Sequence, residues 1–177
     1  RKNLYFNIYG QNSMSSDYRM PNNTYLFNSR FKQHAIKFSL GYRYNNWQNI
    51  FRYHLHSEVP GIPGHVHGNP ADVDLSEIAS SYLDLSTDFN TIRPAQFVTN
   101  QLFIYESNYL QDNLKISFYA GHFINNLQEW EKITRPAFDL TLSKALISPS
   151  IRYSDKNLTI TAGAQISNED NKNNIDD

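Results

Sequence analysis

Apolar and polar residues alternate along most of the chain. In residues 114–121, Leu114, Ile116, Phe118 and Ala120 occupy every second position. Successive side chains of a β-strand point to opposite faces, so a period of two predicts a strand with one apolar face. The same pattern predicts seven strands, whose alternating positions fall in residues 4–8, 36–42, 47–55, about 96–109, 114–121, 138–153 and 158–166.

Three features of this pattern are irregular. Residues 102–105 are apolar at every position, which leaves the orientation of the fourth strand open. In the sixth strand the apolar positions change parity, which predicts a β-bulge near Ser143 and Lys144, and Pro149 restricts the edge at which this strand can pair. The polar tail, residues 168–177, has no periodicity and is predicted to be a loop.

The connections between the predicted strands alternate in length without exception. Tight turns rich in Asn and Asp close three hairpins. The long connections span about residues 12–28, 57–93 and 125–137, and the short turns span residues 44–46, 111–113 and 155–157. All long connections therefore lie at one end of the predicted sheet. Transmembrane β-barrels have this sidedness, with short turns on the periplasmic side and longer loops outside. Periodicity alone leaves one alternative open, an ordinary antiparallel sheet with one face exposed to solvent.

The longest connection contains a helical signal. Asp74 and Glu77 have the spacing of a capping box, with Asp in the position of Ser or Thr. Apolar residues recur after them at helical spacing, at Leu75, Ile78, Tyr82 and Leu85. This pattern predicts a short helix inside the loop.

Composition narrows the classes of protein that fit. The 177 residues include 11 Phe and 12 Tyr, yet the mean hydropathy is −0.60. The net charge of −1 argues against a general nucleic-acid binder, and the absence of Cys excludes a disulfide scaffold, a thiol nucleophile and a zinc finger. The longest apolar run has four residues, whereas a membrane-spanning helix needs roughly 20. Aromatic residues near the short turns suit an interfacial girdle, at Tyr42, Tyr44, Trp47, Tyr109 and Tyr153.

Histidines form the main candidate site. His54 and His56 lie two apart on a predicted strand and so share a face, and His65 and His67 follow in the long connection. Neutral imidazole binds iron, copper and zinc, but no further ligand stands at a diagnostic spacing, so the metal is unassigned and solvated histidines are the alternative. Trp130, in the third long connection, is a candidate for stacking on a ligand, with loop packing as its alternative role.

Catalytic motifs are absent from the sequence. It contains no Gly-x-Ser-x-Gly elbow, no phosphate-binding glycine loop and no His-Glu-x-x-His motif. The sequence therefore predicts a protein that is not an enzyme and that needs no cofactor.

Several short motifs occur in a fixed order along the chain. The run Gly61-Ile-Pro-Gly-His65 is the most distinctive of them. The others are Asn28-Ser-Arg30, Leu40-Gly-Tyr42, Arg52-Tyr53, Asn125-Asn-Leu-Gln-Glu-Trp130, Arg152-Tyr153 and the segment from Leu158 to Gln165. In this order the motifs resemble the barrel of TonB-dependent outer-membrane receptors, especially the ferric-siderophore and ferric-citrate type.

This resemblance implies a barrel of about 22 strands with a plugged lumen in the outer membrane of a Gram-negative bacterium. Residues 1–177 would be an internal segment of an all-β, antiparallel transmembrane barrel, about a third of it, without the plug domain, the TonB-contacting box or the closing strand. The complete receptor would import a scarce ligand, such as an iron–siderophore complex, with energy relayed by TonB. Its partners would be this ligand, the TonB complex, outer-membrane lipid and the rest of the barrel.

The resemblance also assigns the candidate residues to places in the barrel. His65, His67 and Trp130 are expected on external loops that face the ligand, and Arg52, His54 and His56 are expected to line the lumen near its mouth. Two other functions stay open: a passive porin or structural outer-membrane barrel, and a soluble antiparallel β binding module.

Overall fold

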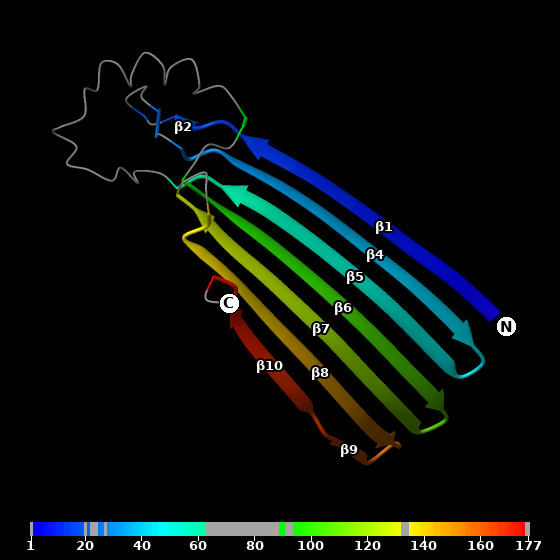
Figure 1. Ribbon diagram of the computed structural model, residues 1–177. Helices are drawn as coiled ribbons and strands as arrows, with labels where there is room; N and C mark the ends of the chain where they lie inside the picture. Colours follow the sequence, from blue (N-terminus) through cyan, green and yellow to red (C-terminus); the bar gives the residue numbers. More distant parts are fainter. Residues whose placement is uncertain are drawn as a thin grey trace, which may run out of the picture.

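The computed structural model describes residues 2–19, 21, 25–26, 28–62, 89–90, 94–131 and 135–175. Within these ranges the protein is all-β and has no helix. One antiparallel sheet contains eight strands, and two short strands pair separately (Figure 1). The strands are β1 (Lys2–Ser15), β2 (Tyr18–Arg19), β3 (Tyr25–Leu26), β4 (Phe31–Tyr44), β5 (Trp47–Pro60), β6 (Ala95–Gln111), β7 (Leu114–Trp130), β8 (Phe138–Ser154), β9 (Thr159–Gly163) and β10 (Ile166–Asn173).

The large sheet is an open meander. Its order is β1-β4-β5-β6-β7-β8-β10, and β9 also pairs with β8, so β1 forms one edge and β9 with β10 the other. The turns β4–β5, β6–β7 and β8–β9 lie together at one end of the sheet, and the longer connections lie at the opposite end (Figure 1). The predicted alternation of long and short connections is confirmed. The long connections are shorter than predicted because the strands continue to Ser15, Pro60 and Trp130.

Two-residue turns close the β4–β5 and β6–β7 hairpins, and a four-residue turn closes β8–β9. Asn45 and Asp112 have positive φ angles of 51° and 47°. A positive φ is what a tight hairpin turn requires, and Asn and Asp tolerate it better than most residues. In the third turn, Asp155 Oδ1 accepts hydrogen bonds from the backbone N–H groups of Asn157 at 2.9 Å and Leu158 at 3.0 Å. The side chains of the predicted turns therefore form the turns themselves.

The predicted bulge near Ser143 and Lys144 is wrong. Strand β8 faces β7 in one unbroken register from Tyr153 to Phe138. The apolar residues change parity because Leu142 and Leu146 lie on one face of a regular strand, whereas Ile147 lies on the other.

The prediction that residues 168–177 form a loop is also wrong, because β10 continues to Asn173. This polar strand is held by its backbone ladder to β8 and by a Lys144–Glu169 ion pair of 2.9 Å. At its end, the Asn174 backbone N–H donates to the Asp139 carbonyl at 2.7 Å. Backbone pairing needs no apolar side chains, so the hydropathy pattern did not reveal this strand.

Pro149 explains the gap between β9 and β10. Both strands keep the same register against β8, with Ser150 opposite Gly163 and Ile147 opposite Ile166. The Pro149 carbonyl accepts a bond of 3.1 Å from the Ala164 N–H. Proline has no N–H to return, so the ladder weakens at this point. Pro149 thus limits pairing at this edge, as the sequence predicts.

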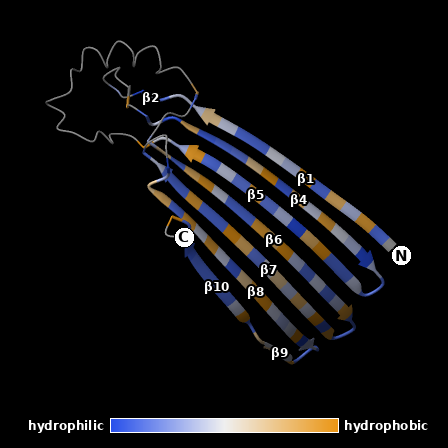
Figure 2. Cartoon of the chain, in the orientation of Figure 1, coloured by the Kyte–Doolittle hydropathy of each residue, from blue (hydrophilic) through white to orange (hydrophobic). Residues whose placement is uncertain are grey.

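Hydrophobic and hydrophilic residues alternate along the strands (Figure 2), and the pairing register collects the two kinds on opposite faces of the sheet. The register places Phe6, Leu40 and Phe51 side by side on the apolar face, and Asn7, Ser39 and Arg52 side by side on the polar face. The register also determines the orientation of the fourth predicted strand, β6, in which Phe103 lies on the apolar face. Large exposed residues form an apolar band across every main strand toward the turn end: Leu4, Phe6, Ile8, Ile36, Leu40, Trp47, Phe51, Tyr105, Ile116, Phe118, Ile147, Ile151, Ile160 and Ile166.

The described residues contain almost no apolar core. Only Ala35 and Ala95 are buried apolar residues among them. A sheet normally buries its apolar face against a second layer, and none of the described elements covers this one. The sheet therefore depends on something outside it to keep water from the apolar band.

A polar cluster, named here the clasp, contains the largest fully buried side chains of the described residues. Asp17 and Arg30 form an ion pair of 2.6 Å whose side chains are fully buried, and Asn28 is fully buried beside them. Asn28 Nδ2 donates to the Pro94 carbonyl at 2.6 Å, and the Gly61 N–H donates to the Arg30 carbonyl at 2.9 Å. The clasp thus joins two connections, β1–β4 and β5–β6, at the end of the sheet opposite the tight turns.

Candidate functional site

The polar face carries a strip of basic residues on β4 and β5. Arg52, His54 and His56 alternate along β5 and share this face, as the sequence predicts. Lys37 of β4 lies directly opposite His54 in the register. A fifth basic residue, Arg43, lies on the same face nearer the tight turn. The strip therefore brings together cationic side chains from two neighbouring strands.

A groove opens where β1, β4 and β5 meet. Its volume is about 410 Å³, and the polar side chains that line it include Tyr9, Lys37, Ser39, Arg52 and His54. Lys37 Nζ lies 5.8 Å from the centroid of the Tyr9 ring, which is within the range of a cation–π interaction. The aromatic ring of the edge strand thus positions the ammonium group beside the groove.

The charges of the groove are only partly balanced. Arg52 Nη1 lies 2.5 Å from Glu106 Oε1, and each of these side chains is 31% exposed. Lys37 and His54 have no ion-pair partner among the described residues. Lys37 and Arg52 are both positively charged, and among the described residues only the Glu106 carboxylate forms an ion pair with either of them. The groove therefore has a net positive charge.

The described residues do not form a metal centre. No group of three or more His, Asp or Glu side chains within them could hold an ion. His56 lies 3.9 Å from Glu58 Oε2, which makes a pair and not a ligand set. His65 and His67 lie outside the described residues, as does the predicted helix of residues 74–85. A metal held by the four histidines stays a prediction.

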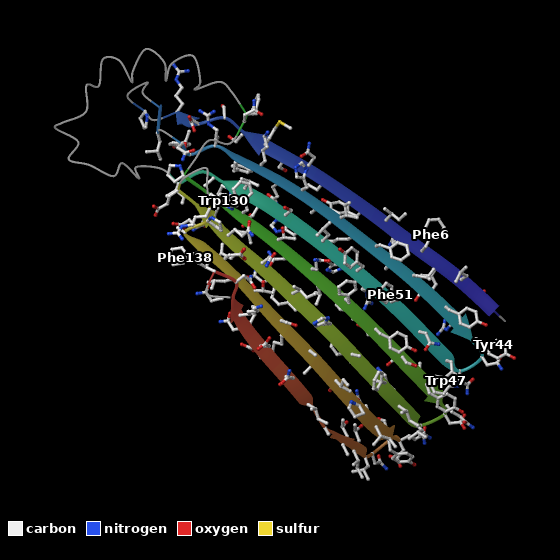
Figure 3. The ribbon with its side chains drawn as sticks, in the orientation of Figure 1. Phe6, Tyr44, Trp47, Phe51, Trp130 and Phe138 are labelled. Carbon is white, nitrogen blue, oxygen red and sulfur yellow. The ribbon has the colours of Figure 1, made fainter. Side chains whose placement is uncertain are left out.

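Trp130 lies apart from the basic strip. It ends β7 and does not belong to a loop, and it is paired with Ala95. Its Nε1 donates to Gln128 Oε1 at 3.2 Å, and the register places both residues on the same side of the sheet as the apolar band, opposite to Arg52. Figure 3 shows Trp130 at the end of the sheet away from Tyr44 and Trp47. The structure therefore does not bring Trp130 together with the β5 histidines.

Sequence reasoning missed Lys37 and Tyr9. The sequence does contain a signal for Lys37. The tight turn at Asn45 pairs Tyr44 with Trp47, and in an antiparallel hairpin every further pair of facing residues has the same sum of residue numbers, which is 91 here. This sum places Lys37 opposite His54. Tyr9 had no such signal, because the connection between β1 and β4 is long and its length does not set the register.

In the described residues the protein is all-β, with an open antiparallel sheet and a groove lined by basic residues on its polar face. In comparisons with known proteins, no family model, no curated protein and no solved structure matches the chain. In the described ranges no helix is long and apolar enough to cross a membrane.

Proposed function

We propose that this chain forms part of the wall of an outer-membrane β-barrel, with the apolar face toward lipid and the polar face toward the lumen. The apolar band carries this proposal. It crosses every main strand of the sheet, with Asn49 and Ser107 as polar positions within it, and its members include Phe6 and Ile166 near the two edges, which are 70% and 71% exposed. A contiguous apolar surface of this extent needs a partner, and lipid is a partner that covers all strands equally.

The height of the band is similar to that of the lipid-facing surface of an outer-membrane barrel. On β5 it extends from Trp47 to Leu55, which are nine residues of one strand. Eight steps of about 3.3 Å give about 26 Å along the strand, and a tilt of about 40° reduces this to a height of about 20 Å. Lipid-facing bands of outer-membrane barrels are about 25 Å tall.

Aromatic residues mark the lower limit of the band. The register places all five predicted girdle residues on the apolar face, in the half of the sheet that ends in the tight turns. Trp47 and Tyr109 are in contact there, with ring centroids 5.0 Å apart. Figure 3 shows Tyr44 and Trp47 beside the first of these turns. Aromatic rings with polar tips favour the boundary between lipid and water.

The edges of the sheet support closure by further strands. Strand β1 has no partner on its outer side among the described residues, and neither do β9 and β10. In lipid, each unpaired backbone group costs several kcal/mol, so a wall of this kind requires the rest of a barrel.

We further propose that the complete barrel is a TonB-dependent receptor that imports an iron complex, and that it is not an enzyme. The ordered motifs support the family, and the basic strip of Arg52, His54 and His56 on the polar face supports passage of an anionic complex. Uptake of radioactive iron, supplied to whole cells as ferric citrate, tests this function. Removal of residues 63–88 should reduce uptake in cells that keep the receptor in the outer membrane, and unchanged uptake would remove this segment from ligand capture.

Cysteine labelling tests the orientation of the wall. The 177 residues contain no Cys, so an introduced cysteine is the only one in this part of the protein, and the unaltered full-length protein serves as the labelling background. In outer membranes that contain the full-length protein, Ile116→Cys should react with a lipid-soluble maleimide, and its neighbour Ser117→Cys should react with a water-soluble one. Equal reaction of both variants with the water-soluble reagent would favour a soluble binding module.

A passive anion pore is the second candidate function, because the same basic strip would select anions in an open lumen. The two functions differ in their energy source. Uptake that persists in cells without TonB would favour the pore, and uptake that stops would favour the receptor.

A further inference from the structure

We propose that the groove between β1, β4 and β5 is a binding site for a small oxyanion, with Lys37 as its principal residue. This inference rests on the proposed function only in placing the polar face toward the lumen, where a solute has access. The site takes the oxyanion group of a solute, a carboxylate, sulfate or phosphate, and not a bare metal cation.

The first argument is charge. The charged or titratable groups around His54 on the polar face are Lys37 from β4, Arg52, His56 and Glu58 from β5, and Glu106 from β6. Glu106 is held by Arg52, and Glu58 lies beyond His56, 3.9 Å from its Nε2. The facing positions of β6 next to His54 are Leu102, Asn100 and Ile104, which carry no charge. The edge strand β1 adds no charge either, since its polar face carries Asn3, Tyr5, Asn7, Tyr9, Gln11 and Ser13. Lys37 and Arg52 therefore bring two permanent positive charges to the groove, no carboxylate lines it, and the excess of positive charge attracts an oxyanion.

The second argument is the supply of hydrogen-bond donors. An ammonium group has three N–H donors, and a guanidinium group has five. The ion pair to Glu106 uses Nη1 of Arg52, and Lys37 Nζ makes a cation–π contact with Tyr9 and no ion pair among the described residues. Arginine and lysine together are a common pair for binding a carboxylate or a phosphate.

The third argument is position. Tyr9 and Lys37 hold the ammonium group at the side of the groove, and His54 lies opposite Lys37 across the β4–β5 pair. The volume of about 410 Å³ accommodates a small anion together with water, and the groove is open on the polar side. A solute that moves along this face passes the donors of two strands at once.

Titration calorimetry of the full-length protein, purified in detergent, tests the site with sulfate as the probe. Sulfate keeps its double negative charge throughout the neutral range. The expected result is measurable binding to the unaltered protein and binding about tenfold weaker in Lys37→Gln, because one charge-assisted contact is lost. Lys37→Arg keeps the charge and should retain most of the affinity.

Lys115→Gln is the matched control. Lys115 lies on the same face beside the β6–β7 turn, opposite Leu110 and Arg152 and away from the groove. It should leave sulfate affinity unchanged, which separates a local site from a general effect of positive charge. Heat-modifiable migration in electrophoresis verifies that each variant is folded.

Either of two results would overturn the site: no sulfate binding by the unaltered protein, or equal weakening by Lys37→Gln and Lys115→Gln. These results differ from a failure of the proposed function, which would appear as water-soluble labelling of Ile116→Cys or as absence of the protein from the outer membrane. Sulfate binding in a protein labelled in that way would keep the site and reject the barrel.

Discussion

The clasp and the apolar band differ in which kind of side chain is buried and which kind is exposed. In the clasp, the charged side chains of Asp17 and Arg30 are fully buried and satisfy each other. In the band, large apolar side chains such as Phe6 and Ile166 are about 70% exposed. An ordinary soluble domain would show the reverse arrangement. The comparison indicates that the clasp is stabilised by its own contacts, whereas the band has no such contacts in the described residues and would be covered by lipid in the proposed wall.

The largest expected effect comes from breaking the clasp. Asp17→Ala leaves Arg30 buried without its carboxylate, and loss of one partner of a buried pair costs about 3–5 kcal/mol. The local free energy of opening should fall accordingly. Hydrogen exchange at the amides of Gly61 and Ile62, which bond to the carbonyls of Arg30 and Pro94, measures this change.

Lys144→Gln provides the control for this prediction. It breaks the Lys144–Glu169 pair, whose side chains are 50% and 54% exposed. Exposed pairs contribute less than about 1 kcal/mol. If Asp17→Ala costs no more than Lys144→Gln, the clasp is not a source of local stability.

The next largest effect distinguishes the two faces of the sheet. Phe51 lies in the apolar band, and its neighbour Ile50 lies on the polar face between Gly41 and Glu106. Phe51→Arg should destabilise the protein in membranes by about 2–4 kcal/mol, because a charge then faces lipid. Ile50→Arg should cost less than about 1 kcal/mol, because its charge faces water and Glu106.

Urea titration of the full-length protein in lipid vesicles, followed by heat-modifiable migration, measures this pair of variants. Equal costs at Phe51 and Ile50 would contradict a lipid face and a water face. A large cost at Phe51 in vesicles that disappears in aqueous buffer would sharpen the distinction.

The smallest effect concerns the packing of the clasp. A methyl group at Gly61 would collide with the backbone and side-chain oxygens of Asn28, whereas a methyl group at Gly10 would meet open space. Overpacking of this kind costs about 1–3 kcal/mol. Gly61→Ala should therefore accelerate hydrogen exchange at Ile62, and Gly10→Ala should not. Equal exchange in both variants would indicate that Asn28 can shift without cost.

Local pattern predicted the strands and the tight turns because both depend on neighbouring residues. Alternation marked the centres of β4, β5 and β7, and the Asn-rich turn at Asn45 fixed the pairing of β4 with β5. The strand ends were predicted too short, because Pro60 and Trp130 continue strands through backbone pairing with no apolar alternation to mark them.

Contacts across the long connections could not be predicted. The pairing of Tyr9 with Lys37, and of Asp17 with Arg30, depends on the path of the chain between β1 and β4. No local pattern fixes such a path. For the site, the sequence supplied Arg52, His54 and His56 with their common face, and it missed the lysine that completes the groove.

The tight turns also have a consequence for the order of folding. Each of the pairs β4–β5, β6–β7 and β8–β9 is closed by a short turn, so its loop-closure entropy is small. Hairpins of this kind form in about 1–10 μs, much faster than pairings across long loops. Three hairpins can therefore form first as complete units, each with its apolar side chains already on one side. The wall would then grow by whole hairpins, and the slow steps would be the junctions that the clasp and the long connections bring together.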